Sequence, residues 1–151
     1  MSAATPVAIA AESPHTVEAG RMVAEMGGSA VDIAVGAALA ATVSESLMCS
    51  LGGSAFINVK VPGGAPQLFD GADVMPPVPA VELADSERHW QVATIPYGDG
   101  ITVNVGHQSV AVPGMLRALE LAWQRHGSLP WAKVVEPAIA FARSGVTVNH
   151  T

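Results

Sequence analysis

The sequence has 151 residues, of which 50% are hydrophobic and only 13% are charged, and its formal net charge is −6. A chain of this length is the size of one domain and can bury roughly 70% of the surface that it exposes when unfolded. The acidic balance, with no run of Lys or Arg, excludes the electrostatic footprint of a nucleic-acid binder or of a protein attracted to anionic membranes.

The mean hydropathy of +0.38 is high for a domain that is surrounded by water. Two explanations stay open. Another polypeptide covers part of the apolar surface, or the many alanines raise the value without creating adhesive patches.

The sequence also bears on the compartment. Its single cysteine, Cys49, excludes an internal disulfide framework. The first six residues lack the basic segment that opens a secretory signal. The longest apolar segment, residues 30–43, carries Asp32 and is shorter than the ~20 apolar residues that cross a membrane. We therefore expect a cytoplasmic protein without a membrane partner.

The chain begins with an expected strand and helix. Residues 7–10 are a short apolar run before a polar turn, which is typical of a buried strand. Ser13 is suited to cap a helix that has Pro14 at its first position. We expect this helix to end at Gly27, where a glycine fits a left-handed C-cap.

A second helix is expected over residues 30–43. Ser29 precedes it as the N-cap, and Asp32 in its first turn complements the helix dipole. The segment is apolar all round and rich in small residues. Such a helix is expected to be central and closely packed on several sides.

A hairpin and a long excursion follow. Residues 55–61 and 67–69 have strand patterns, and the turn between them contains Pro62 and two glycines. Residues 77–106 are predicted to be a surface excursion, with one strand at 101–103.

The last part of the chain predicts a strand and two helical segments. Residues 109–112 have a strand pattern, and residues 114–126 form an amphipathic helix that ends at Gly127. Pro130 opens the final helical segment, which Pro137 is expected to kink or to split in two. Groups of predicted strands therefore alternate with groups of predicted helices along the chain. This order indicates an α/β fold of the layered α+β type.

No set of residues in the sequence forms a self-contained catalytic or metal site. The five histidines have no metal-ligand spacing, so no metal and no cofactor are expected. Cys49 with a distant histidine could form a thiol nucleophile pair, but a buried small apolar residue is the favoured interpretation. Neither Gly27-Gly28 nor Gly52-Gly53 leads into the Lys-Ser/Thr of a phosphate-binding loop.

Several spaced blocks carry more information than any single motif. They are residues 18–20 (Glu-Ala-Gly), 28–32 (Gly-Ser-Ala-Val-Asp), Gly52-Gly53, 109–114 (Ser-Val-Ala-Val-Pro-Gly), 129–132 (Leu-Pro-Trp-Ala) and 136–139 (Glu-Pro-Ala-Ile). In this order and spacing the chain resembles the amino-terminal part of the gamma-glutamyltranspeptidase family. The similarity runs over residues 7–148, with a gap in the excursion.

The resemblance implies a fold and a reaction. Members of this family are N-terminal nucleophile hydrolases with a four-layer αββα sandwich, so residues 1–151 would be a single incomplete domain at the start of the large subunit. The family's nucleophile is a threonine that becomes the first residue of a small subunit after self-cleavage, and its own α-amine serves as the base. The sequence stops at Thr151, before that region, and Thr151 has no free α-amine. The resemblance therefore implies no catalytic residue in this chain, a partner that carries the threonine, and a small-molecule amide substrate.

The resemblance also identifies one substrate-binding position. Family members have a segment similar to Asp-Gly-Arg-Glu after the hairpin, and its arginine holds the α-carboxylate of the glutamyl substrate. This chain has Ala72 at the arginine position, followed by Asp73. A methyl group cannot replace the paired, planar contact of a guanidinium, so Ala72 and Asp73 are expected to be weak substrate contacts.

Three interpretations of function remain from the sequence. The leading one is a fragment or subunit of a gamma-glutamyltranspeptidase-like amidohydrolase, with a structural and pocket-wall role. The second is an acylase-like relative that acts on amides without an α-carboxylate, which Ala72 favours. The third is a non-catalytic remnant or binding domain.

Overall fold

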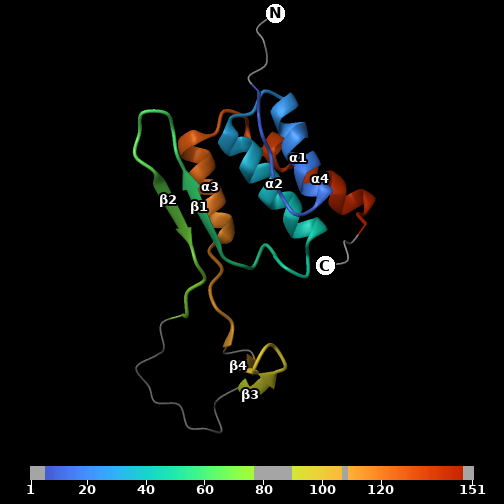
Figure 1. Cartoon of the computed structure of the whole chain (residues 1–151), viewed down its shortest axis with the longest axis vertical. Helices are drawn as coiled ribbons and strands as arrows, with labels where there is room; N and C mark the ends of the chain where they lie inside the picture. Colours follow the sequence, from blue (N-terminus) through green and yellow to red (C-terminus); the bar gives the residue numbers. More distant parts are fainter. Residues whose placement is uncertain (1–5, 77–89, 107–108, 148–151) are drawn as a thin grey trace, which may run out of the picture. The chain divides into compact units, whose positions relative to one another are not determined.

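The computed structural model describes residues 6–76, 90–106 and 109–147 (Figure 1). These residues form two compact units. One consists of Met1–Ala72 with Pro113–Thr151, and the other of Asp73–Val112. The first unit contains the helices and one hairpin, and the second contains another hairpin.

Helix α1 (Pro14–Glu25) has the ends that its sequence predicts. The Ser13 side chain accepts a hydrogen bond from the backbone N–H of His15, and proline occupies the first helical position. At the other end Gly27 has a φ of +83°, and its N–H bonds the Ala24 carbonyl while the next N–H bonds that of Val23. This pair of bonds is a Schellman motif, which needs the left-handed conformation that glycine adopts freely.

Helix α2 (Ala30–Ser44) is the centre of the first unit, as predicted. Ser29 and Asp32 form a capping box at its start. The helix packs on α1, on α3 (Met115–His126) and on α4 (Trp131–Ser144). The buried apolar core around it consists of Ala19, Val31, Val35, Leu39, Ala40, Phe69, Met115, Ala118, Leu119, Ala122, Val134 and Ala138.

Helix α4 continues through Pro137, so of the two predicted alternatives, a kink or a split, the split into two helices is wrong. The proline removes one backbone N–H from the helix. Its ring is buried, as are the neighbouring side chains of Val134 and Ala138. Burial on the core side offsets the lost hydrogen bond. No helix among the described residues is long and apolar enough to cross a membrane.

Asp32 connects the start of α2 to the turn between α3 and α4. Its Oδ2 accepts hydrogen bonds from the N–H of Ser29 at 2.8 Å, from the N–H and hydroxyl of Ser128 at 2.8 and 2.7 Å, and from the N–H of Leu129 at 3.2 Å. The residue is fully buried. Burial would raise the pKa of this carboxyl, but the hydrogen bonds from Ser128 and Ser29 outweigh burial and hold the pKa below its usual range.

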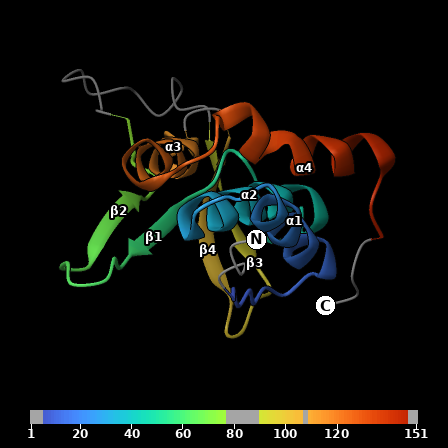
Figure 2. The ribbon, with the colours of Figure 1, turned by 90° about the horizontal axis from the view of Figure 1, so that it is seen from above.

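A hairpin lies against α3 (Figure 2). Strand β1 (Ala55–Val59) pairs antiparallel with β2 (Gln67–Gly71), and Ile57 is opposite Phe69. Phe69 is part of the core, and Ile57 packs against it. The opposite face exposes Phe56 and Leu68, which are 66% and 64% accessible. The hairpin is therefore confirmed, with one face on the core and one face in solvent, where Phe56 and Leu68 lie beside Asn58 and Asp70.

Two predicted strands are wrong or reduced. Residues 7–10 form no strand, and Val7 is 51% exposed. A run becomes a strand only when a neighbouring strand satisfies its N–H and C=O groups, and no strand among the described residues does so. Residues 109–112 form a single bridge, between Val112 and Val74.

The second unit contains an antiparallel hairpin of β3 (Trp90–Ile95) and β4 (Ile101–Gly106), in which Ile95 is opposite Ile101. The strand expected at residues 101–103 is confirmed as part of β4. Residues 77–89 of the predicted excursion lie outside the described residues.

Candidate functional site

The predicted substrate contacts begin where β2 ends. Ala72 follows Gly71 directly and is half-buried. Its N–H donates a hydrogen bond to Oδ1 of Asp70 at 2.9 Å. An aspartate that accepts from the N–H two residues later makes a tight local turn, so this contact fixes the backbone at Ala72. Asp73 belongs to the second unit, so the two predicted contact residues fall in different units.

Two of the blocks that carry the family resemblance, Gly52-Gly53 and residues 109–114, meet the end of β2 beside Ala72. The carbonyl of Gly53 accepts the N–H of Met115, the first residue of α3, at 3.1 Å. A Cβ placed on Gly71 would lie 2.6 Å from the Cβ of Ala118 and 2.9 Å from the Gly114 carbonyl oxygen. The end of β2, the diglycine turn and the start of α3 are therefore in direct backbone contact. The sequence identified these blocks, but their spacing did not predict that they touch.

Two cationic side chains of α3, the helix that begins beside Ala72, contact residues other than Ala72. Arg117, in the first turn of α3, donates a hydrogen bond to Glu120 at 2.6 Å. Arg125 lies over the Phe69 ring, 5.6 Å from its centroid. Among the described residues, no hydrogen bond or ion pair joins a Lys or Arg side chain to Ala72. Position 72 itself carries an alanine where the resemblance implies an arginine.

Cys49 lies in the loop that joins α2 to β1, at a cavity of about 230 Å³. The thiol is half-buried and lies 3.6 Å from the Glu45 carbonyl oxygen. Burial, with a smaller effect from the Glu45 charge, raises the pKa of this thiol. A raised pKa disfavours the thiolate, which argues against a thiol nucleophile at Cys49. The side chain is less buried than the sequence predicts.

Comparison with known proteins decides the family. The family model for gamma-glutamyltranspeptidase matches residues 16–151. The chain belongs to this family. It is 32% identical over 143 residues to glutathione hydrolase 2 of Arabidopsis thaliana, an alignment that covers 94% of this chain and 22% of the relative. It is 30% identical over 142 residues to the human glutathione hydrolase 5 proenzyme, which covers 93% of this chain and 22% of the relative.

The fold agrees with that family. The gamma-glutamyltranspeptidase of Pseudomonas nitroreducens superposes with a TM-score of 0.73 at 27% identity, over 94% of this chain and 40% of that one. The expected layered α+β fold, as a partial form of the family's fold, is therefore confirmed. The chain spans about a fifth of the length of the curated relatives. Much of a family member lies outside the region that it matches.

Proposed function

We propose that this chain is the amino-terminal part of a gamma-glutamyltranspeptidase-like amidohydrolase, in which it supplies structure and one wall of the acyl pocket. The observation that carries the proposal is the family match over residues 16–151 in a chain that spans only about a fifth of its curated relatives. The nucleophile would come from the remainder of the enzyme, on a companion polypeptide or a continuation of this one. A cytoplasmic location is part of the proposal.

The proposed reaction is acyl transfer through a threonine of that remainder. Its hydroxyl attacks the substrate amide carbon, and its own α-amine takes the hydroxyl proton. The carbon–nitrogen bond then breaks, the amine leaves with the proton, and an acyl ester remains on the threonine. Water releases the acid, or a second amine takes the acyl group. In this scheme Ala72 and Asp73 lie at the acyl pocket and form no bond to the reacting atoms.

A second candidate function is an acylase that acts on amides without an α-carboxylate. One observation favours it, namely the alanine at position 72. Loss of a charge-assisted pair commonly costs about 2–5 kcal/mol of binding, so this corner would bind ordinary gamma-glutamyl compounds poorly.

The experiment compares this chain alone with this chain co-expressed with the polypeptide that is encoded directly downstream. The substrates are a gamma-glutamyl anilide and the matching acyl anilide that lacks the α-carboxylate. We expect turnover only in the co-expressed sample, and its loss when the terminal threonine of the companion is changed to alanine. Faster turnover of the second anilide would favour the acylase. Absence of such a threonine both from a companion polypeptide and from any continuation of this chain would contradict both enzyme proposals and favour a non-catalytic domain.

A further inference from the structure

A hydrogen bond between Thr16 and Glu45 joins the start of α1 to the end of α2. Thr16 is buried, and its hydroxyl donates to Oε1 of Glu45 at 2.6 Å. The two residues are 29 positions apart in the sequence. A hydroxyl that donates to a carboxylate makes one of the stronger hydrogen bonds in proteins, and its usual length is short. The bond therefore holds the Glu45 side chain against α1.

Glu45 is also the residue at which α2 ends and the loop to β1 begins. It is the C-cap of the helix. Its carbonyl accepts the N–H groups of Met48 at 2.8 Å and of Cys49 at 3.0 Å. Glu45 thus forms the first turn of the loop with its backbone, while its side chain is held by Thr16. We call residues 45–54 the α2–β1 loop.

Further hydrogen bonds connect the α2–β1 loop to the candidate site. The N–H of Gly53 donates to the Ser50 carbonyl at 3.1 Å, and the carbonyl of Gly53 accepts the N–H of Met115 at 3.1 Å. Met115 follows Gly114, whose backbone lies against that of Ala72. A series of contacts within the first unit therefore leads from the start of α1, through the loop, to the corner at Ala72.

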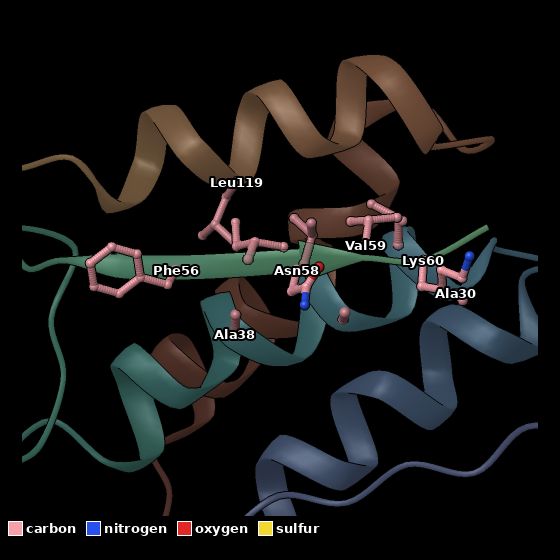
Figure 3. Close-up of a pocket in the computed structure, with 11 residues that line it drawn as sticks. Ala30, Ala38, Phe56, Asn58, Val59, Lys60 and Leu119 are labelled. Carbon is pink, nitrogen blue, oxygen red and sulfur yellow. The ribbon is translucent and has the colours of Figure 1, made fainter. Parts of the chain in front are cut away.

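Side-chain packing gives the α2–β1 loop little support. Its large apolar side chains are exposed, namely Leu47, Met48 and Leu51. A groove of about 380 Å³ also lies between α2 and β1. Figure 3 shows this groove with Ala38 on the helix and Phe56 on the strand above it. The position of the loop therefore depends on its hydrogen bonds, and the bond from Thr16 to Glu45 ties the loop to α1.

We propose that Thr16 is a positioning residue, which holds the α2–β1 loop through Glu45 and thereby sets the place of Ala72 at the acyl pocket. The inference rests on the proposed function, in which this corner is one wall of that pocket. Thr16 acts through these residues and does not itself contact the acyl group. A pocket wall acts on the acyl group in the ground state and in the transition state alike, so a displaced wall raises KM and changes kcat little.

The test removes the hydroxyl and keeps the shape of the side chain. Thr16→Val replaces the hydroxyl by a methyl group, and Thr16→Ser keeps the hydroxyl. Ser44→Ala is the matched control, because it removes a buried hydroxyl 3.1 Å from that of Thr16. The Ser44 hydroxyl donates to the Ala40 carbonyl inside α2, and neither of its two hydrogen bonds reaches the loop.

Each variant is assayed in the assembled enzyme, with whichever of the two anilides the parent turns over faster. Thr16→Val should raise the KM about tenfold and leave kcat within about twofold of the parent. A change that only destabilises the fold lowers the amount of active enzyme, and so the apparent kcat, without raising KM. Thr16→Ser and Ser44→Ala should therefore keep the KM of the parent.

Hydrogen exchange is the second measurement on the same enzymes. The amides of Met48, Cys49 and Met115 are hydrogen-bonded in the loop or at its contact with α3. Thr16→Val should speed their exchange, because the loop opens more often without its tie to α1. Thr16→Ser should restore the exchange rates of the parent.

A double-mutant cycle tests whether the effect passes through this one bond. Glu45→Ala removes the other partner and should also raise the KM. The double variant should raise the KM no further than either single change, since all three lack the same bond. Additive effects of the two changes would overturn the inference.

Two other results would overturn the inference and leave the proposed function standing. One is a parent-like KM in both Thr16→Val and Glu45→Ala. The other is an equal rise of KM in Ser44→Ala and Thr16→Val, which would assign the effect to general loosening between α1 and α2. An assembled parent enzyme that turns over neither anilide would remove the proposed function and the inference with it.

Discussion

Gly114 and Ala72 are in contact through their backbones, since a Cβ placed on Gly114 would lie 2.5 Å from the carbonyl oxygen of Ala72. The carbonyl group of Gly71 is almost as close, at 2.6 Å. These neighbours are main-chain atoms, which cannot rotate away as a side chain can. The contact therefore fixes the start of α3 against the segment that we propose lies at the acyl pocket.

Gly114→Ala should destabilise the chain, because the added methyl group pushes β2 and α3 apart. We expect a loss of about 1–3 kcal/mol in the free energy of unfolding, measured by urea denaturation. Gly52→Ala is the control, because the nearest atom to its Cβ position is the Ser50 Oγ at 3.9 Å. Equal stability of the two variants would mean that the backbone at Gly114 has room to move.

The Asp32 carboxyl should make stability depend on acid pH. Its pKa is lowered in the folded chain, chiefly because the hydrogen bonds from Ser128 and Ser29 outweigh the effect of burial. A lowered pKa stabilises the fold fully above the unfolded pKa, which is about 4. This stabilisation is lost as the pH falls from about 4 through the lower folded value. Asp32→Asn keeps the shape and removes the charge, so the variant should be less stable by about 1–3 kcal/mol at neutral pH.

The pH series separates this charge effect from simple loss of packing. As the pH falls from about 4 through the lower folded pKa, the unfolding free energies of the Asp32→Asn variant and the parent should converge. Ser128→Ala removes one hydroxyl donor from the carboxylate and keeps the backbone N–H, so it should have the same acid dependence with a smaller amplitude. A constant difference between Asp32→Asn and the parent at all pH values would contradict the lowered pKa.

The isolated chain should self-associate. Phe56 and Leu68 are exposed on the outer face of the hairpin, and Leu47 and Met48 are 88% and 76% exposed in the loop after α2. Exposed apolar surface of this kind, beside an unpaired strand edge, favours aggregation. Light scattering of the purified chain should show oligomers, and Phe56→Ser with Leu68→Ser should reduce them. A stable parent monomer that melts cooperatively would contradict this prediction.

Local signals predicted the helices well. Ser13, Gly27 and the Ser29–Asp32 capping box act on residues within one turn, so the sequence alone determines where α1 and α2 begin or end. The contact of Asp32 with Ser128 spans 96 residues, and helical spacing carries no information about it. The prediction of a strand at residues 7–10 failed because an apolar run forms a strand only where a neighbouring strand, often distant in the sequence, pairs with it.

The candidate site was predictable only in part. The family resemblance located Ala72 at the end of the hairpin, and the structure places it directly after β2, where Gly71 contacts Gly114. No local pattern indicates that Gly53, Gly71 and Gly114 meet, because tight backbone contacts between distant glycines leave no periodic signal. Whether Ala72 contacts the acyl group remains a prediction.

Ala72→Arg should change substrate choice in the assembled enzyme. The α-carboxylate of a gamma-glutamyl substrate would gain a paired guanidinium contact at this position. Ala72 is half-buried, and its backbone is held by Asp70, so an arginine side chain starts from a fixed point and can extend toward solvent. We expect the KM for a gamma-glutamyl anilide to fall by about tenfold, which corresponds to about 1.4 kcal/mol.

The matched substrate is the acyl anilide of the same length without the α-carboxylate, and its KM should change little, because only the first substrate gains the paired contact. Ala72→Gln is the control for charge. Glutamine also adds a long side chain that can donate a hydrogen bond, but it carries no charge. It should lower the KM for the gamma-glutamyl anilide much less than arginine does. If arginine changes both substrates equally or neither of them, Ala72 does not face the acyl pocket. The arginine position that the resemblance assigns to residue 72 would then be wrong.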